Sequence, residues 1–343
     1  MNLVKKLFGI ENMTEVTQHK QNTPDTVFYC NALNGQSSYN ICINCDMTVS
    51  CNCQDYDGSG QIGDLHTHSF EEIFRGGKAQ QFREILARGE YPVQVCPGCM
   101  ELRTIPRSEA NHYLTHFVPP YIGIMVENTI LCNLSCRFCE RSNTFEIRKQ
   151  KRMKLADMEQ VASILKENHI QMISFHNLGE PFLSNTVHKE IEMLIRYNPT
   201  LKIIISTNGA HIDTDEKVEA ALLSEHLFIS IDGPNQAIMA MYQVGGNFEK
   251  SYANLKRLVT ERNKRGNTRP IIEWKYVVFN WNDQDEHIEE AVRLAKEAGV
   301  DRISFLKGGA PEQHLSTRYT DSAFFQNLGE SECRGREIWF NGR

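Results

Sequence analysis

The stretch "CNLSCRFCER", residues 132–141, places Cys132, Cys136 and Cys139 in one short segment. Thiolates are the usual ligands of iron–sulfur clusters, and a [4Fe–4S] cube takes four of them. Three protein thiolates leave one iron free for another ligand, as a catalytic zinc site also keeps one position open. The alternatives are a zinc site or three buried thiols. A zinc site needs a fourth ligand, but the segment contains no fourth Cys and no His, and no His closely follows it.

The composition is that of an ordinary soluble globular protein, with 41% hydrophobic and 23% charged residues. The 343 residues suggest about two domains. A net charge of −6 gives no support for a nucleic-acid partner. No apolar run approaches the ~20 residues that span a bilayer, and the opening "MNLVKKLFGI" is too short for a signal sequence. We therefore expect a cytoplasmic protein without a membrane partner, whose eleven cysteines favour metal over disulfides.

From residue 121 onward, apolar runs alternate with helical patterns. Six β units alternating with helices predict a parallel sheet that is buried on both faces. Six is fewer than the eight strands of a closed TIM barrel. The predicted fold is α/β, an open partial (β/α)6 TIM barrel with a small cysteine-rich α+β N-terminal domain. The expected strands are 121–130, 171–177, 202–207, 226–232, 271–279 and 302–306, and the expected helices are 155–168, 185–198, 214–225, 248–265 and 283–298.

The domain organisation follows from the same pass along the chain. Seven of the cysteines fall before residue 103, among short alternating stretches such as "YNICIN" and "MTVSCNC" that are typical of a hairpin. The closing "ECRGREIWFNGR" loosely repeats a Cys followed by a strand and an Asn-Gly turn. The expected parts are a polar tail at 1–26, a cysteine-rich domain at 27–103, a linker at 104–120, the barrel at 121–310 and an extension at 311–343 that could begin a second such hairpin.

Polar motifs follow the predicted strands. Gly179-Glu180-Pro181 comes after the second strand, "STNG" (206–209) after the third, and "SIDG" (230–233) closes the fourth. In parallel α/β folds, chemistry gathers at the carboxyl ends of the strands. The cysteine segment and these three motifs are therefore expected on one rim.

This pattern resembles the radical S-adenosylmethionine (radical SAM) superfamily over residues 121–310, whose hallmark is the CxxxCxxC loop. The resemblance implies a [4Fe–4S] cluster held by the three cysteines as catalytic and metal-binding residues. It also implies that the open iron chelates S-adenosylmethionine. One electron from the cluster then splits the sulfonium to methionine and a 5′-deoxyadenosyl radical, which takes a hydrogen from the substrate. The protein supplies orientation and excludes water.

The resemblance also implies roles for the residues on the rim. Phe138 is expected near the adenine, and Glu180 near the methionine ammonium. Gly179 and Glu180 belong to the family's Gly-Gly-Glu-Pro string, in which Leu178 here replaces the first glycine. The remaining cofactor-binding residues are expected to be Ser206 and Asn208 at the ribose and Ser230 and Asp232 after the fourth strand. Lys275 could hold a carboxylate or simply extend from the barrel.

The N-terminal cysteines resemble the SPASM or twitch module, which binds auxiliary [4Fe–4S] clusters. Here the module precedes the barrel rather than following it. The resemblance implies at least one auxiliary cluster on Cys30, Cys51, Cys96 and Cys99. Cys53 competes for the role of Cys51, because residues i and i+2 of a strand share a face.

Two other arrangements of these cysteines stay open. Cys42, Cys45, Cys53 and Cys333 could hold a second auxiliary cluster. A zinc ribbon on Cys42-x2-Cys45 and Cys96-x2-Cys99 is the rival for the whole domain.

We therefore expect a radical SAM oxidoreductase-type enzyme that acts on a small polar or carbohydrate-type substrate. Its electron donor would be a flavodoxin or ferredoxin. The basic stretch 147–154 is expected to be a solvated surface, with donor docking as a second reading. Alternatives are a peptide-modifying maturase, an epimerase, which needs a thiol hydrogen donor such as Cys53 or Cys333, and a non-catalytic iron–sulfur or zinc scaffold.

Overall fold

The computed structural model of the chain describes residues 25–307, 309–318 and 335–340. Nearly all of the predicted tail and Cys333 lie outside the described residues. The chain divides into two compact units. Unit 1 comprises 1–130, 140–179 and 193–202, and unit 2 comprises 131–139, 180–192 and 203–343.

Unit 1 contains the first two strands of the predicted barrel. β6 (Gly123–Val126) and β7 (Met172–Ser174) pair in parallel, and between them in the chain come α5 (Arg141–Ile147) and α6 (Leu155–Glu167). The cysteine-rich segment extends this sheet, because β2 (Cys42–Ile43) pairs in parallel with β6. β3 (Thr48–Ser50) and β4 (Gln61–Asp64) follow in antiparallel order. Backbone hydrogen bonds thus join the cysteine-rich segment to the first strand of the predicted barrel.

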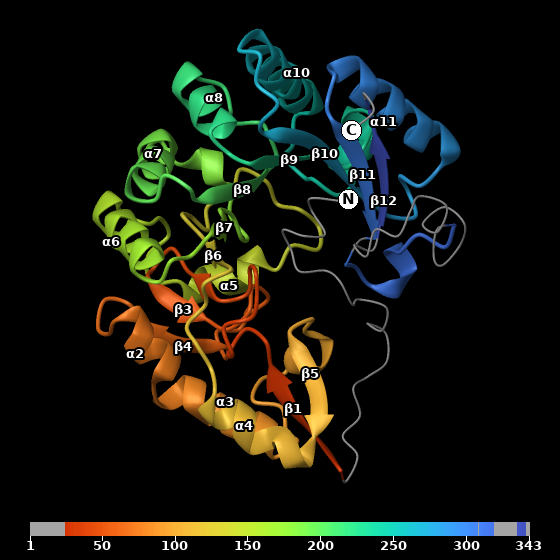
Figure 1. The fold of residues 1–343 in the computed structure, drawn as a ribbon. Helices are drawn as coiled ribbons and strands as arrows, with labels where there is room; N and C mark the ends of the chain where they lie inside the picture. The colour runs from red at the N-terminus through yellow and green to blue at the C-terminus, as the bar shows by residue number, and fades with distance from the viewer. Residues whose placement is uncertain (1–24, 308, 319–334, 341–343) are drawn as a thin grey trace. The chain divides into compact units, whose positions relative to one another are not determined.

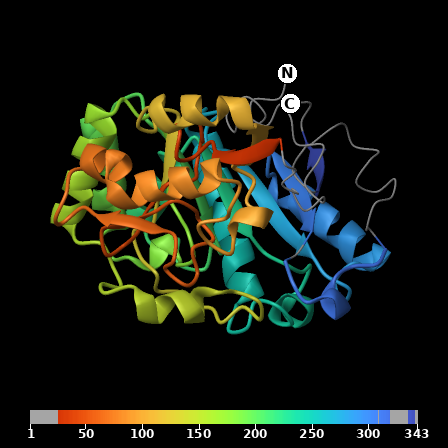
Figure 2. The same ribbon diagram turned by 90° about the horizontal axis from the view of Figure 1, so that it is seen from below.

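A second part of unit 1 is a two-stranded antiparallel sheet of β1 (Thr26–Cys30) and β5 (Leu102–Pro106). Helices α3 (Gly77–Ala87) and α4 (Ala110–Thr115) pack beside β1 (Figures 1 and 2). The short helix α2 (Phe70–Arg75) precedes α3. The predicted linker at 104–120 is thus partly structured, because it includes the end of β5 and all of α4. The polar and apolar residues of so short a segment show no clear helical or strand period, so the sequence did not predict these elements.

Unit 2 contains the other four strands. β8 (Lys202–Thr207), β9 (His226–Ser230), β10 (Ile271–Val278) and β11 (Arg302–Lys307) form a parallel ladder. Most of β10 is buried, as expected for a strand covered on both faces. The intervening helices are α8 (Asp215–Leu222), α9 (Gln236–Ala240), α10 (Phe248–Lys264) and α11 (Asp285–Ala298). Helix α7 (Val187–Tyr197) contributes residues to both units.

The predicted elements are present with small shifts at their ends. Each expected strand overlaps an observed parallel strand, and each expected helix overlaps an observed one. Side-chain caps explain the helix starts, since Thr214 and Asn247 accept hydrogen bonds from the backbone of α8 and α10. α11 ends at Gly299, whose φ of 74° a glycine adopts without strain. The α/β class and the strand order of a partial barrel are confirmed. None of the described helices is long and apolar enough to cross a membrane.

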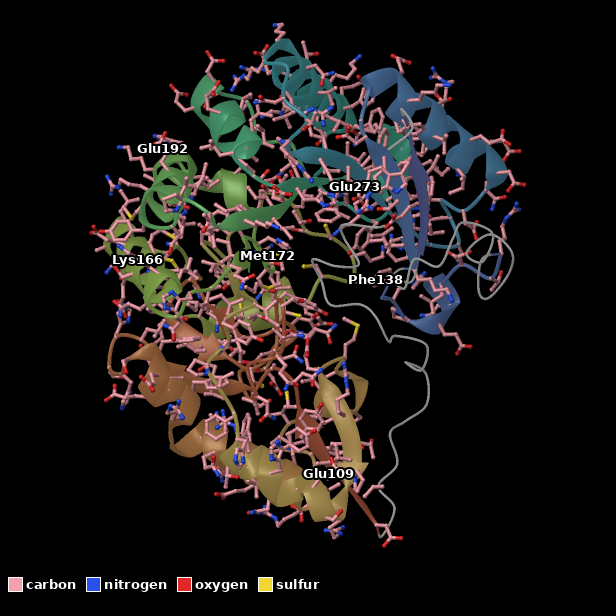
Figure 3. The ribbon with its side chains drawn as sticks, viewed as in Figure 1. Glu109, Phe138, Lys166, Met172, Glu192 and Glu273 are labelled. Carbon is pink, nitrogen blue, oxygen red and sulfur yellow. The ribbon has the colours of Figure 1, made fainter. Side chains whose placement is uncertain are left out.

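The C-terminal strand joins the parallel strands of unit 2. β12 (Gly335–Trp339) pairs antiparallel with β11. The possible second cysteine hairpin stays a prediction, because Cys333 and residues 341–343 lie outside the described residues. The Arg302 guanidinium donates to Glu337 at 2.9 Å, and the Trp339 ring lies 4.7 Å from the guanidinium carbon. On its other side Arg302 meets Glu273 of β10, labelled in Figure 3. The ion pair of Arg302 with Glu337 therefore accompanies the backbone pairing of β12 with β11.

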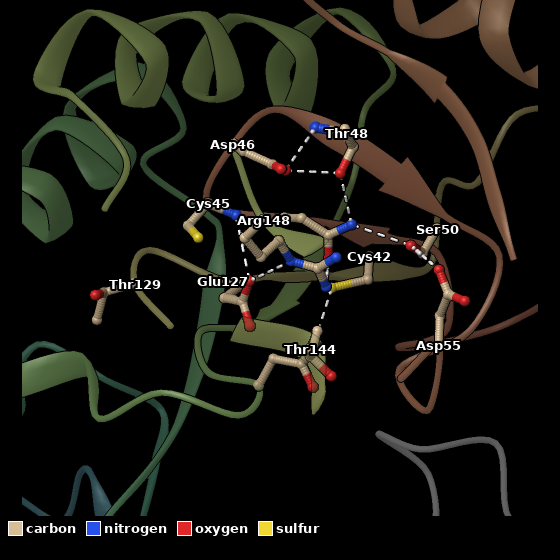
Figure 4. A network of polar contacts seen from close by, with 12 residues as sticks. Cys42, Cys45, Asp46, Thr48, Ser50, Asp55, Glu127, Thr129, Thr144 and Arg148 are labelled. Atoms are coloured by element: carbon tan, nitrogen blue, oxygen red, sulfur yellow. Dashed lines mark hydrogen bonds and ion pairs between the residues drawn. The ribbon is translucent and has the colours of Figure 1, made fainter. Parts of the chain in front are cut away.

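A buried ion pair lies where the cysteine-rich segment meets β6 (Figure 4). The Arg148 Nε donates to Glu127 Oε2 at 3.1 Å, and the two side chains are 1% and 0% exposed. Arg148 also donates to Asn44 Oδ1 at 2.8 Å. Three segments far apart in the sequence thus share one charge network. The prediction of a solvated basic stretch is wrong for Arg148, although Lys149, Arg152 and Lys154 are exposed.

We predict that Arg148→Met destabilises the protein by about 3–5 kcal/mol, because it leaves the Glu127 carboxylate buried without its counter-charge. The double variant Glu127→Gln/Arg148→Met should recover part of that loss. Urea unfolding measures both. Arg152→Met, in the same segment but exposed, is the matched control and should stay within about 0.5 kcal/mol of the wild type. Equal stability of the two single variants would contradict the prediction.

Candidate functional site

The cysteine loop lies in unit 2 and is fastened through its backbone. The amide of Ser135 donates to the carbonyl of Val244 at 2.9 Å, and that of Arg137 donates to Tyr242 at 3.0 Å. The Cys139 amide donates to the Cys136 carbonyl at 3.1 Å, which closes a tight turn between the last two cysteines. The loop has no regular secondary structure, so these bonds supply its order.

The structure brings the three thiols of this loop together. Burial is the largest of the causes that raise the pKa of Cys136 well above the usual thiol range. The negative charge of Asp232 is the next, and the charges of Cys132 and Cys139 follow. The Leu134 amide donates to the Cys132 sulfur at 3.4 Å. A buried thiol whose pKa is raised in this way deprotonates readily only when a cation is bound.

Glu180 ties the ends of neighbouring segments together. Its Oε1 accepts from Thr207 Oγ1 at 2.6 Å and from the Phe182 amide at 3.0 Å, and its Oε2 accepts from the Asn208 amide at 2.8 Å. The side chain is buried, and burial raises its pKa in spite of these bonds. The carboxylate thus lies on the predicted rim, but three protein donors already engage it.

The other polar residues of the rim also have defined partners. Asn208 donates to Asn133 Oδ1 at 3.0 Å, which links the third strand end to the cysteine loop. Lys275 Nζ donates to Ser206 Oγ at 3.4 Å, so the lysine extends toward the rim. The Ser230 carbonyl accepts from Gln243 Nε2 at 3.0 Å. Sequence reasoning missed Asn133 and Gln243; Asn133 could have been noticed as a polar residue inside the cysteine motif.

Asp232 is a buried carboxylate close to the cysteine loop. Its Oδ1 accepts from the Val277 amide at 2.7 Å, and its own amide donates to Gln243 Oε1 at 2.9 Å. Burial raises its pKa to about 7, while the Val277 bond and the charge of Lys275 act in the opposite direction. A carboxyl group that changes charge near neutrality is a candidate functional group.

Phe138 lies among aromatic rings. Its ring centroid is 6.1 Å from that of Tyr242, 5.8 Å from Phe279 and 5.1 Å from His314. Trp281 is 6.2 Å away and stacks on Phe279 at 4.7 Å. Flat apolar surfaces of this kind can contact a nucleobase and exclude water. Only Phe138 was singled out from the sequence, because its partners are dispersed along the chain.

Gly179 belongs to unit 1. A Cβ at this position would lie 1.9 Å from the carbonyl oxygen of Thr129. The glycine is therefore required by the close approach of two backbones, whether or not it also contacts a cofactor.

A second candidate site lies in unit 1, at a small, partly open cavity. Its lining includes Cys30, Cys51, Cys96 and Cys99, together with apolar side chains and Asn52. Burial raises the pKa of Cys51, and Cys30, Cys96 and Cys99 raise it further. Burial also raises the pKa of Cys96 to about 11. The structure thus brings together the four cysteines that the sequence favoured.

Cys53 is placed differently from Cys51. β3 ends at Ser50, so the alternation of a strand does not extend to either cysteine. Cys51 lines the cavity, whereas Cys53 is absent from the lining and its amide donates to Asn40 Oδ1 at 3.2 Å. The geometry favours Cys51 as the ligand.

Cys42 and Cys45 lie apart from this cavity. The Cys45 thiol donates to the carbonyl of Gln150 at 3.1 Å, and the Cys42 sulfur accepts from Asn177 at 3.5 Å. The structure therefore does not bring together the four cysteines of the zinc-ribbon reading. The second auxiliary set includes Cys333, which lies outside the described residues.

The donor sets of both sites fit iron–sulfur clusters. In the described ranges, no three His, Cys, Asp or Glu side chains are placed to hold one metal ion. A cube binds each thiolate through a different iron, so its cysteines surround a cavity rather than a single point. The four cysteines around the largely apolar cavity match this requirement. The three cysteines of the loop supply the thiolates that such a cluster binds.

Family models match both parts of the chain in which the two candidate sites lie. Residues 129–269 match the family model of the radical SAM superfamily. Residues 30–100 match that of an iron–sulfur cluster-binding domain, SPASM. No curated protein matches the chain at a significant level.

Solved structures of radical SAM enzymes are similar to parts of the chain. TYW1 with a lysine-pyruvate adduct bound has 15% identity and a TM-score of 0.40, covering 54% of this chain and 65% of that one. anSMEcpe with bound AdoMet and Kp18Cys peptide has 16% sequence identity and a TM-score of 0.42. The match covers 55% of this chain and 52% of that one. BtrN in complex with AdoMet and 2-DOIA has 23% sequence identity and a TM-score of 0.29. The match covers 38% of this chain and 50% of that one. The chain thus spans less than two thirds of each of these relatives.

The raised pKa of Asp232 predicts a specific pH dependence of stability for the metal-free protein. The folded state holds the proton more tightly than the unfolded state, so the stabilisation is complete at acid pH and is lost as pH rises through about 7. Between pH 5 and 8.5 the wild type should lose about 2–3 kcal/mol more than Asp232→Asn does. Urea unfolding at both pH values measures this difference. Parallel pH profiles for the two proteins would show that the carboxyl is not perturbed.

Proposed function

Because the chain belongs to the radical SAM superfamily and carries a SPASM iron–sulfur domain, we propose that it is an enzyme that cleaves S-adenosylmethionine and removes a hydrogen atom from a substrate. When bound, the [4Fe–4S] cluster supplies one electron to the sulfonium, so that the S–C5′ bond breaks into methionine and a 5′-deoxyadenosyl radical. The electron itself has to come from a donor protein such as a flavodoxin or ferredoxin.

The observation that carries this proposal is the three-thiol loop. The charges of Cys132 and Cys139 act on the Cys136 thiol, so the three cysteines lie near one another, and the loop is bonded to the 242–244 segment. These residues would hold the cluster and leave one iron for the amino and carboxylate groups of S-adenosylmethionine.

The other residues of the rim would bind and orient S-adenosylmethionine. The ring faces around Phe138 offer an apolar surface for the adenine and exclude water. Asn208 and Ser206 would donate to or accept from ribose hydroxyls. Glu180 accepts hydrogen bonds from three protein donors. We therefore propose that it mainly holds the ends of the neighbouring segments in place and interacts only weakly with the methionine ammonium.

The polar groups inside unit 2 favour a small polar substrate. Ser206, Asp232 and Lys275 offer a hydroxyl, a carboxyl of raised pKa and an ammonium within one region. A sugar or other polyhydroxylated compound presents hydroxyls that such groups can bind. Removal of a hydrogen atom, a proton and one electron from such an alcohol would yield a carbonyl compound, and the auxiliary cluster would accept the electron.

Two other reactions remain as alternatives of the same class. A peptide could supply the substrate hydroxyl or thiol, as a peptide is bound in one of the similar structures. An epimerase would return a hydrogen atom to the substrate. A scaffold without catalysis is the alternative of another class, and it predicts no cleavage of S-adenosylmethionine.

We expect the anaerobically reconstituted protein to release 5′-deoxyadenosine when it is reduced with dithionite. Cys136→Ala should abolish this release, because it removes one of three ligands of the cluster. Cys45→Ala is the matched control, since that thiol is buried and bonds to a backbone carbonyl; it should retain cleavage within a few-fold. Release that persists in Cys136→Ala, or none in the wild type, would refute the proposal.

Isotope uptake separates oxidation from epimerisation. In deuterated buffer, an oxidation should yield a product two electrons more oxidised without solvent deuterium at the reacting carbon. An epimerase that uses a thiol donor should place one deuterium there without net oxidation. Mass spectrometry and NMR of the product distinguish the two outcomes once a substrate is found by screening polyhydroxylated compounds.

A further inference from the structure

Asn52 is the exception among the residues that line the cavity in unit 1. Of the described residues there, four are cysteines and the others are apolar, except for Asn52. Its apolar members are Leu33, Phe82, Leu86, Pro92, Val93, Val95 and Leu102. A single amide among apolar side chains must form its hydrogen bonds locally, because a buried polar group without a partner is costly.

The amide of Asn52 is oriented toward a cysteine sulfur. Its Nδ2 lies 2.9 Å from Cys99 Sγ, and its Oδ1 accepts from the Gln54 backbone amide at 2.5 Å. The backbone donor can only bind the oxygen of the side-chain amide, so the NH2 group must face the sulfur. Asn52 is 4% exposed, and its position is therefore set by the fold rather than by solvent.

A hydrogen bond to a ligand sulfur changes the chemistry of an iron–sulfur cluster. Reduction adds negative charge to the cluster and its thiolates, and a donor at the sulfur stabilises that charge. Hydrogen bonds to the sulfurs are accordingly one of the factors that set the reduction potential. In surroundings of low dielectric constant this effect is larger than in water.

We propose that Asn52 is a positioning residue that raises the reduction potential of the auxiliary cluster by donating a hydrogen bond to Cys99. The inference rests on the proposed function, in which this cluster takes the electron left on the oxidised substrate. A higher potential makes the cluster a better electron acceptor. Asn52 thereby favours the oxidation over the epimerisation.

The test is a redox titration of the full-length protein, monitored by the EPR signal of the reduced cluster. The variant Cys132→Ala/Cys136→Ala/Cys139→Ala serves as background, so that the signal comes from the auxiliary cluster alone. In this background, Asn52→Leu should lower the equilibrium constant for one-electron reduction at least tenfold, which corresponds to about 59 mV. Asn52→Asp should lower it further, because it keeps an acceptor for Gln54 but replaces the donor with a charge.

Asn34→Leu is the matched control. Asn34 is also buried beside a cysteine of the cavity, but it donates to the Cys30 carbonyl at 3.0 Å rather than to a sulfur. Its potential should equal that of the background. Unchanged potentials in Asn52→Leu and Asn52→Asp with full iron content would overturn the inference and leave the proposed function intact. A folded background protein without iron would overturn the auxiliary site itself.

Discussion

The constraint on which the rest of the structure depends is the cost of placing thiolates side by side in an apolar interior. Burial and neighbouring sulfurs raise the pKa of Cys51 and of Cys136. Without metal these thiols stay neutral, whereas iron supplies the positive charge that makes several thiolates compatible. Cluster binding is therefore coupled to proton release at both sites. The surrounding structure has to hold the cysteines in place while they are still uncharged, through backbone bonds such as those of the 131–139 loop.

The same balance between burial and compensating contacts distinguishes two carboxyl groups of the predicted rim, Glu180 and Asp232. Glu180 is buried and meets three donors, which oppose but do not cancel the rise in its pKa that burial causes. Asp232 has fewer donors, and its pKa rises to about 7. The two carboxyl groups therefore differ. Glu180 holds the ends of neighbouring segments together through its hydrogen bonds, whereas Asp232 can change its charge near neutral pH.

The sequence predicted the strands, the helices and the polar residues at the strand ends because each depends on local pattern. An apolar run predicts a strand wherever its partner lies, and a polar residue after it marks the rim. The partner of β2 could not be predicted, since two residues of a strand do not specify β6 as their neighbour. The burial of Arg148 could not be predicted either, because its partners Glu127 and Asn44 come from distant segments. The sequence left the choice between Cys51 and Cys53 open for a different reason: the rule of alternation applies only within a strand, and β3 ends before both residues.

The position of the SPASM module before the barrel raises the question of what orients it. A flexible linker would leave its cluster without a fixed direction. In unit 1, however, β2 is hydrogen-bonded to β6, and Arg148 joins Glu127 to Asn44. A Cβ at Gly123 of β6 would lie 2.0 Å from the Ser38 carbonyl oxygen, so the two backbones meet there directly. Sheet pairing, a buried charge pair and a glycine contact orient the module relative to β6. The order of the two parts along the chain can therefore change while β6 still holds the module by its backbone, and the loop that carries the three cysteines begins only a few residues after that strand.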